Sequence, residues 1–201
     1  MRETILEKSS ELFLKLGFKS VTMDDIASEM GISKKTIYIH FSNKTDLVEE
    51  CTMYIFHKIA ENINCIRVLK KNPIEELYEI KKMVMVHLHD ERGSTEYQLQ
   101  KYYPKIFIAL RKKQFQIMEE CIVDNIKKGV GEGIYRENIN VDFIGRIYFS
   151  GVTSLKDQEI FPSDQFPINL LMDDFLEYHL RGIVTPKGRK ILNALINSNY
   201  E

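Results

Sequence analysis

The chain has 201 residues, of which 44% are hydrophobic and 28% are charged, and its formal net charge is −1. This length allows one or two domains with a sizeable core, and the composition excludes a disordered or fibrous protein. A net charge near zero excludes nucleic-acid binding through overall charge, so any such binding must depend on a local cluster of basic residues.

Three cysteines, Cys51, Cys65 and Cys121, form no CxxC pair and leave an odd count, which favours reduced thiols packed as small apolar residues. The first residues alternate charged with apolar side chains, unlike a signal peptide. No later run reaches the ~20 apolar residues that a membrane span needs. These features predict a cytoplasmic protein.

The first predicted helix covers residues 3–16, where apolar residues recur at helical spacing, and Gly17 ends it. Thr22 and Asp25 then have the spacing of a capping box, in which each residue satisfies a free backbone amide of the other. They predict a short second helix that ends at Gly31, a residue that tolerates the positive φ of a tight turn.

Ser33 is the N-cap expected for a third helix, through Ile39, and two short helices joined by a glycine-containing turn predict a helix-turn-helix. The segment Gly31–Lys44 holds three lysines and one histidine but no carboxylate. Asn43 is the N-cap expected for a further helix, whose free amides would form an anion site with the Lys44 ammonium. A generic three-helix unit with solvated lysines is the alternative, but it would not need this basic face.

The run ILEKSSELFLKLGFKSVTMDDIASEMGISKKTIYIHFSNKTDLV, residues 5–48, resembles the DNA-binding domain of the tetracycline-repressor (TetR) family. The resemblance implies phosphate contacts by Thr22, Tyr38, His40 and Lys44, and a major-groove surface formed by Ser33, Lys34, Lys35 and Thr36. The family often has a small residue at position 35, so Lys35 is a departure that would contact either a phosphate or a guanine. The alternative for His40 is an imidazole that is merely exposed.

The rest of the chain is helical in pattern, without a hairpin signal or strand–helix alternation. We therefore expect an all-α protein with a helix-turn-helix DNA-binding domain at residues 1–47 and a larger helical effector-binding and dimerisation domain at 48–201. The helix that starts at Lys44 should continue some twenty residues into the second domain. Further helices should start at Asn72-Pro73, Pro104, Val141 and Pro167, and the glycines 129, 131 and 133 predict a flexible turn.

Apolar residues at intervals of three and four in the last two long helices are typical of a four-helix bundle formed by two subunits. The predicted dimer interface contains Ile144, Ile147, Gly151, Leu155, Ile168, Leu171, Phe175 and Tyr178. The alternative is that these residues fill the core of their own subunit. A helix-turn-helix usually binds DNA as a dimer on two half-sites, which favours the interface.

A pocket for a small effector is expected mainly from the family resemblance. Its candidate lining combines flexible apolar side chains with a few polar groups: Met83, His87, Tyr103, Phe107, Met118 and Tyr148. Ordinary core packing is the alternative for each of them.

No catalytic residue, metal site or cofactor is predicted. His87 and His89 would point about 200° apart on a helix and cannot share a metal ion, and no hydrolase, metalloprotease or phosphate-loop motif occurs. The sequence predicts a homodimeric repressor that binds a pseudo-palindromic DNA operator and is released by a small, largely apolar effector. Two alternatives are a protein of the same fold without an effector that acts in chromosome organisation, and an α-helical enzyme.

Overall fold

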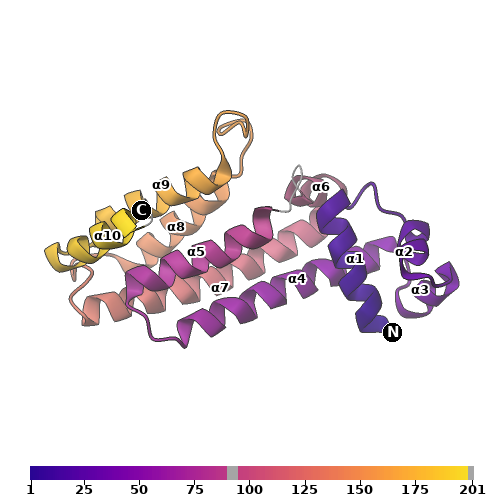
Figure 1. Cartoon of the computed structure of the whole chain (residues 1–201), viewed down its shortest axis with the longest axis horizontal. Helices are drawn as coiled ribbons and strands as arrows, with labels where there is room; N and C mark the ends of the chain where they lie inside the picture. Colours follow the sequence, from indigo (N-terminus) through magenta and orange to yellow (C-terminus); the bar gives the residue numbers. More distant parts are fainter. Residues whose placement is uncertain (90–94, 199–201) are drawn as a thin grey trace. The chain divides into compact units, whose positions relative to one another are not determined.

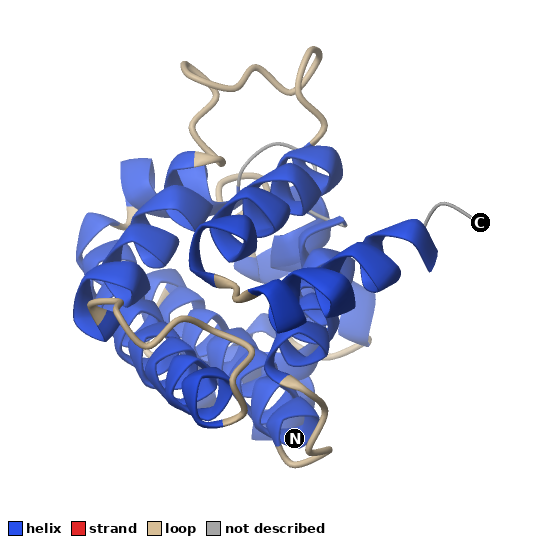
Figure 2. Ribbon diagram, turned by 90° about the vertical axis from the view of Figure 1, so that its left-hand side faces the viewer, coloured by secondary structure: helices blue, strands red, loops and turns tan. Residues whose placement is uncertain are grey.

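Ten α-helices make up the part of the chain that the structure describes, and Figure 2 shows them joined by loops with no strand among them. This computed structural model describes residues 1–89 and 95–198. The helices are α1 (Arg2–Leu16), α2 (Met23–Met30), α3 (Lys34–His40), α4 (Lys44–Arg67), α5 (Pro73–His89), α6 (Thr95–Tyr102), α7 (Pro104–Gly131), α8 (Val141–Ser154), α9 (Ile168–Ile183) and α10 (Pro186–Ser198). The predicted all-α class is confirmed. Within the described residues, no helix combines the length and apolar character that a membrane span requires.

The described residues group into two compact units, and α4, α5 and α7 each contribute residues to both. Unit 1 consists of Met1–Asn62 and Val86–Gln114, and unit 2 consists of Ile63–Met85 and Phe115–Glu201. The predicted division into a DNA-binding domain at 1–47 and an effector domain at 48–201 is a division by function and not by compact structural unit. It stays a prediction.

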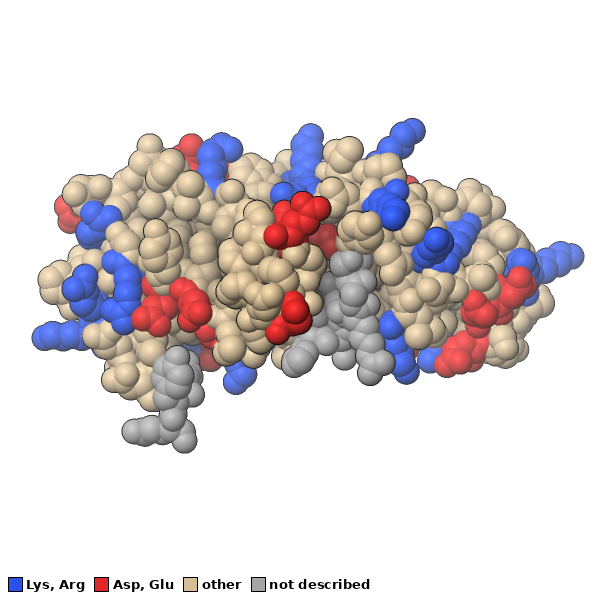
Figure 3. Space-filling model, turned by 90° about the horizontal axis from the view of Figure 1, so that it is seen from above, with Lys and Arg blue, Asp and Glu red and all other residues tan. Residues whose placement is uncertain are grey.

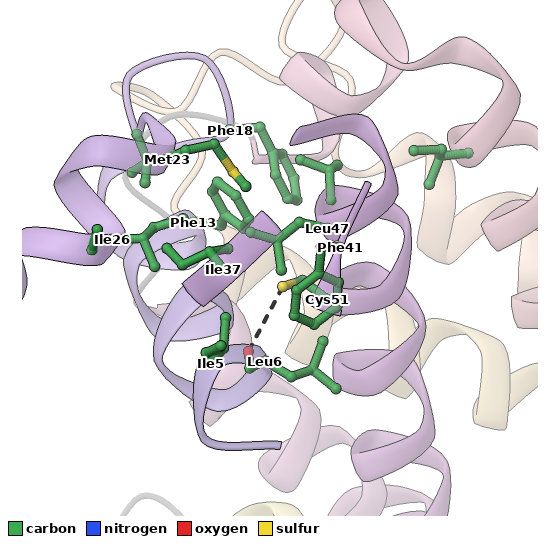
Figure 4. Close-up of a cluster of buried hydrophobic side chains, with 14 of the residues drawn as sticks. Ile5, Leu6, Phe13, Phe18, Met23, Ile26, Ile37, Phe41, Leu47 and Cys51 are labelled. Carbon is green, nitrogen blue, oxygen red and sulfur yellow. Dashed lines mark hydrogen bonds between the residues drawn. The ribbon is translucent and has the colours of Figure 1, made fainter. Parts of the chain in front are cut away.

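Side chains from α1 to α4 form the core of unit 1 (Figure 4). Ile5 and Phe13 from the apolar stripe of α1 are fully buried in it, together with Ile37 of α3. The Cys51 thiol of α4 donates to the Leu6 carbonyl oxygen at 3.7 Å, and burial raises the pKa of this thiol to about 12. Cys51 is therefore a small core residue, as its isolated position in the sequence predicts.

Residues from much later in the chain complete the core of unit 1. Leu99 of α6 and Ile106 of α7 are buried in the same cluster, and Tyr103 and Phe107 pack against it. α6 also lies beside the end of α1 (Figure 1), where the Gln98 side chain reaches the backbone at Lys19. α6 and α7 thus contribute to the same core as α1 to α4.

Unit 2 has a separate apolar core that encloses a hydrogen-bonded polar group. The Asn125 side-chain amide of α7 donates to Glu76 Oε1 and to the Pro73 carbonyl oxygen, both at 2.9 Å. The Tyr135 hydroxyl donates to Asn125 Oδ1 at 3.1 Å, and Lys128 Nζ donates to Glu76 Oε2 at 3.1 Å. Because these buried groups satisfy one another, the network joins α5, α7 and the segment after α7.

The glycine-rich turn is shorter than predicted. α7 continues through Gly129 and Gly131, and only Gly133, with φ 68°, has the left-handed conformation of a turn. A Cβ atom at residue 129 would overlap the ring of Tyr135, so this glycine permits a close approach between the ring and the helix backbone. The prediction of a flexible turn that begins at Gly129 is therefore wrong. The four predicted helix starts agree with α5, α7, α8 and α9 within one residue.

Candidate nucleic-acid interface

Helix α2 begins with the predicted capping box. Thr22 Oγ1 accepts a hydrogen bond from the Asp25 backbone N–H at 3.1 Å, and the Thr22 backbone N–H donates to Asp25 Oδ2 at 2.8 Å. The Thr22 hydroxyl also donates to this carboxylate at 2.7 Å. These hydrogen bonds from Thr22 lower the pKa of Asp25. The start of α2 is thus fixed by contacts between residues three positions apart.

The turn between α2 and α3 has the geometry that its residue types predict. Gly31 ends α2 in the left-handed conformation, with φ 64° and ψ 29°. Ile26 and Ile37 are completely buried where α1, α2 and α3 pack together, and Ile32 packs against the same cluster. This small core fixes the orientation of α3 relative to α2, as a helix-turn-helix requires.

The N-terminal turn of α3 presents three of the four predicted base-reading residues in defined contacts. Ser33 Oγ accepts from the Thr36 backbone N–H at 3.1 Å, and the Ser33 and Thr36 hydroxyl groups lie 2.8 Å apart. Lys34 Nζ donates to Asp24 Oδ2 at 2.7 Å, and this hydrogen bond raises the pKa of the lysine. Both side chains of the Lys34–Asp24 pair are exposed, so exchanging this pair for a DNA contact costs little free energy.

Helix α3 also carries an exposed apolar residue that is not in the predicted DNA-binding set. Ile39 is 70% exposed, and Tyr38 beside it is 44% exposed. A signal for this existed, because Ile37 and Ile39 are two positions apart and so point about 200° away from each other on a helix. Since Ile37 is buried, Ile39 must face away from the core, next to the predicted DNA contacts.

Helix α4 starts with a second local capping arrangement. Asn43 Oδ1 accepts from the Asp46 backbone N–H at 3.0 Å, and Asp46 Oδ2 accepts from the Ser42 backbone N–H at 2.8 Å. The sequence predicted the Asn43 cap and its Asp46 partner. These bonds fix the first turn of α4, which carries Lys44.

The Lys44 side chain lies close to the start of α2. Its ammonium group donates to the Lys19 carbonyl oxygen at 3.4 Å, and the Asp25 carboxylate is near enough to stabilise its charge. Partial burial has the larger effect and lowers the pKa of Lys44. Since Asp25 is already hydrogen-bonded to Thr22, Thr22 and Lys44 form one polar site at which two helices begin.

The structure therefore places all eight predicted DNA-binding residues in unit 1, on α3 or at the first residues of α2 and α4. Lys35 is exposed and forms no ion pair with the described residues, whereas His40 is only half-buried in the last turn of α3. This arrangement brings hydroxyl groups, ammonium groups and a phenol together around one short helix. Such groups are the usual hydrogen-bond donors to DNA phosphates and base edges.

The predicted effector-binding residues are divided between the two units. Tyr103 and Phe107 pack against the core of unit 1, whereas Met118 and Tyr148 pack against the core of unit 2. Met83 is half-buried in α5. His87 also belongs to α5, but its side chain lies outside the part of the chain that the structure describes.

The predicted dimer residues on α8 and α9 differ in exposure. Ile147 and Tyr178 are exposed, while Leu155 is buried in its own chain. A Cβ atom at Gly151 would overlap the Phe175 ring, so these two residues pack against each other within unit 2. The remaining members, Ile144, Ile168 and Leu171, are half-buried.

A hollow with a volume of about 570 Å³ lies between α1 and α4 in unit 1. Asp46, Glu49 and Glu50 line it, and none of the predicted effector-binding side chains that the structure describes does. The carboxylates would repel DNA phosphates, so this hollow lies outside the candidate DNA-binding surface.

Comparisons with known proteins agree with this geometry. The family model described as bacterial regulatory proteins of the tetR family matches residues 5–51. The uncharacterised helix-turn-helix transcriptional regulator YerO of Bacillus subtilis is 25% identical over 98% of this chain and 69% of its own. The helix-turn-helix transcriptional repressor KstR2 of Mycolicibacterium smegmatis is 23% identical, over 94% of this chain and 93% of its own.

Among solved structures, a transcriptional regulator from Saccharomonospora viridis in complex with choline has a similar fold. Its TM-score is 0.75 at 19% identity, over 92% of this chain and 97% of that one. The segment that the family model matches contains the Thr22–Asp25 capping box, the Ser33 and Asn43 caps, the Gly31 turn and all eight predicted DNA-binding residues. Residues 5–51 therefore match the tetR family of bacterial regulatory proteins, and the chain as a whole is similar to helix-turn-helix transcriptional regulators.

Proposed function

We propose that this protein is a repressor whose homodimer binds a pseudo-palindromic DNA operator through residues 1–47. A small, largely apolar effector would bind residues 48–201 and release the protein from DNA. The observation that carries the proposal is the polar surface of α3, which is held by the buried Ile26 and Ile37 and flanked by Lys44. An effector changes DNA affinity only if it binds the DNA-free and DNA-bound conformations with different affinities.

The contacts divide into two classes in this proposal. Thr22, Tyr38, His40 and Lys44 bind phosphates and fix the position of the protein, while residues 33–36 lie in the major groove and distinguish bases. Ile39 joins the second class, because its exposed side chain suits the methyl group of thymine.

An exposed apolar surface on α8 and α9 supports the homodimer. Phe143 and Ile147 of α8 and Leu170 and Tyr178 of α9 are between 46% and 77% exposed, and the two helices are in contact. Exposed apolar side chains on two adjacent helices are typical of an interface, and a second copy would also supply the second half-site contact.

We expect the double substitution Ile147→Glu and Tyr178→Glu to convert the protein into a monomer, because a dimer would have to bury four added carboxylates. Light scattering measures the molar mass. Ile108→Glu is the matched control, since Ile108 is 66% exposed but lies on α7, and it should leave the dimer intact. A double variant that remains dimeric would contradict the proposed interface.

Support for the proposed effector site comes from the fold and from a protein of similar structure. The similar regulator from Saccharomonospora viridis was solved with choline, so a protein of this fold accommodates a small molecule. Apolar and aromatic side chains such as Met83, Met118 and Tyr148 are suited to a largely apolar ligand. A thermal shift and loss of DNA binding with the metabolite extract of the host would test this part of the proposal.

DNA binding itself is tested by measuring affinity for the DNA upstream of the protein's own gene as a function of salt concentration. If each subunit neutralises about four phosphates, the logarithm of the affinity should fall with the logarithm of salt concentration at a slope near −7. Lys44→Ala should weaken binding to operator and random DNA alike. Lys34→Ala should relax the preference at particular base pairs. A wild-type slope shallower than about −3 would contradict the set of phosphate contacts.

A further inference from the structure

Lys19, in the loop between α1 and α2, is an exposed cation outside the predicted DNA-binding set. Several lysines of unit 1 are neutralised by ion pairs, such as Lys8 with Glu29 and Lys34 with Asp24. Lys19 forms no ion pair with the described residues. An exposed ammonium group without a carboxylate partner is available to bind an external anion.

The backbone of Lys19 lies directly against a proposed phosphate contact. The Lys19 carbonyl oxygen accepts the hydrogen bond from Lys44 Nζ at 3.4 Å, so the two lysines are neighbours although they are 25 positions apart in sequence. The nearby Asp25 carboxylate is hydrogen-bonded to the backbone and hydroxyl of Thr22. The Lys19 backbone therefore lies beside the Lys44 ammonium group, where α2 and α4 begin.

Helix α6 holds the Lys19 backbone in place. Gln98 Oε1 accepts from the Lys19 backbone N–H at 3.0 Å. The Gln98 side chain also occupies the space that a Cβ atom would take at Gly17, where φ is 84°. Because a side chain at residue 17 would both overlap Gln98 and strain the backbone, the loop approaches α6 closely only with glycine at this position.

Helix α6 also restricts the Lys19 side chain. The Lys19 ammonium group lies over the Tyr102 ring, 5.0 Å from its centroid, in a cation–π contact. Figure 3 shows exposed Lys and Arg side chains on the face of the molecule that it views. A long side chain that is already restricted loses less conformational entropy when it binds a phosphate.

We propose that Lys19 is a further contact to the DNA phosphate backbone, and that Gln98 and Tyr102 are its positioning residues. The proposal rests on the proposed DNA-binding function and extends the contact surface beyond residues 22–44 to the loop before α2. The DNA would be bound by Lys19 and Lys44 together, at phosphates that flank the bases read by α3.

The first test is Lys19→Ala, measured with the full-length protein on the DNA upstream of its own gene and on a random duplex. Loss of one phosphate contact per subunit should weaken binding roughly tenfold on both duplexes and make the salt slope of the dimer shallower by about 1.8. Lys19→Arg should retain most of the affinity.

Lys58→Ala is the matched control. Lys58 lies over the Tyr54 ring at 4.7 Å in the same unit, but on α4 and with Glu7 at 3.9 Å. The Lys58→Ala substitution removes the same charge and the same kind of ring contact as Lys19→Ala, and it should leave the salt slope of DNA binding unchanged. Equal losses in the Lys19→Ala and Lys58→Ala proteins would assign the effect to total charge and overturn the proposal.

A double-mutant cycle tests the positioning role of α6. Tyr102→Leu should weaken DNA binding in the wild-type background and have no further effect in the Lys19→Ala background, while Tyr102→Phe should bind as wild type. A purely structural role of Tyr102 would make the two effects additive, which would contradict positioning.

If Lys44→Ala weakens binding and Lys19→Ala does not, the Lys19 contact is wrong and the DNA-binding function stands. If the wild-type protein binds neither duplex, the function itself fails.

Discussion

Replacing Asn125 with leucine is expected to lower the free energy of unfolding by about 3 kcal/mol, because it leaves several buried polar groups without partners. Asn125 is 1% exposed and joins Glu76, Pro73 and Tyr135 by three hydrogen bonds. Leucine has the same branching as asparagine and is not smaller, so the loss would come from unpaired polar groups rather than from a cavity. Denaturant titration of the purified protein measures the change.

A double-mutant cycle separates the network from simple loss of packing. Tyr135→Phe removes one hydrogen bond and should cost about 1 kcal/mol alone. Combined with Asn125→Leu it should cost less than the sum, because the Tyr135 hydroxyl is then no longer left unpaired. Asn193→Leu on the exposed face of α10 is the control and should have almost no effect. Strict additivity of the two buried substitutions would contradict the network.

The second large effect expected is a loss of stability in acid that depends on His179. This residue of α9 is 8% exposed, and burial lowers the pKa of its imidazole to about 4, from an ordinary value of 6.5. The rings of Tyr148 and Phe175 contact it at centroid distances of 4.9 and 6.0 Å. Since the folded state binds the proton less tightly than the unfolded state, protonation favours unfolding.

Above pH 6.5 His179 is neutral in both the folded and the unfolded state, and the free energy of unfolding does not depend on it. As the pH falls from 6.5 towards 4, the unfolded state binds the proton first, so the free energy of unfolding decreases, by about 3 kcal/mol in total. The unfolding free energy of the wild type should therefore fall more than that of His179→Phe over this interval. Leu192→Ala, which removes a buried apolar side chain of unit 2 but no titratable group, should lower stability by the same amount at each pH. A difference between wild type and His179→Phe that is independent of pH would show that His179 does not titrate with folding.

Local signals allowed much of the helical structure and most of the candidate site to be predicted from sequence. The caps at Thr22, Ser33 and Asn43 depend on side chains that bond to a backbone N–H three residues away. Gly31 adopts the left-handed conformation for which glycine is suited. Such contacts form within one helical turn, so residue type and spacing are sufficient to predict them.

Predictions failed or were incomplete where a distant residue decides the outcome. Gly129 is helical because its missing side chain makes room for the Tyr135 ring, which the glycine pattern alone does not reveal. Ile39 is exposed because the core of the helix-turn-helix takes Ile37 instead. In each case two local arrangements were possible, and packing selected one of them.

The sequence by itself therefore determined the all-α class, the three-helix DNA-binding domain and the polar residues at its helix starts, because periodicity, caps and turns are local. The tertiary structure alone decided that Lys44 contacts the backbone of Lys19 and that Gln98 binds the same residue from 79 positions away. It also decided that Leu99 and Ile106 complete the core of unit 1. These contacts depend on how the chain folds back on itself, and apolar burial drives that folding without a motif that one sequence can display.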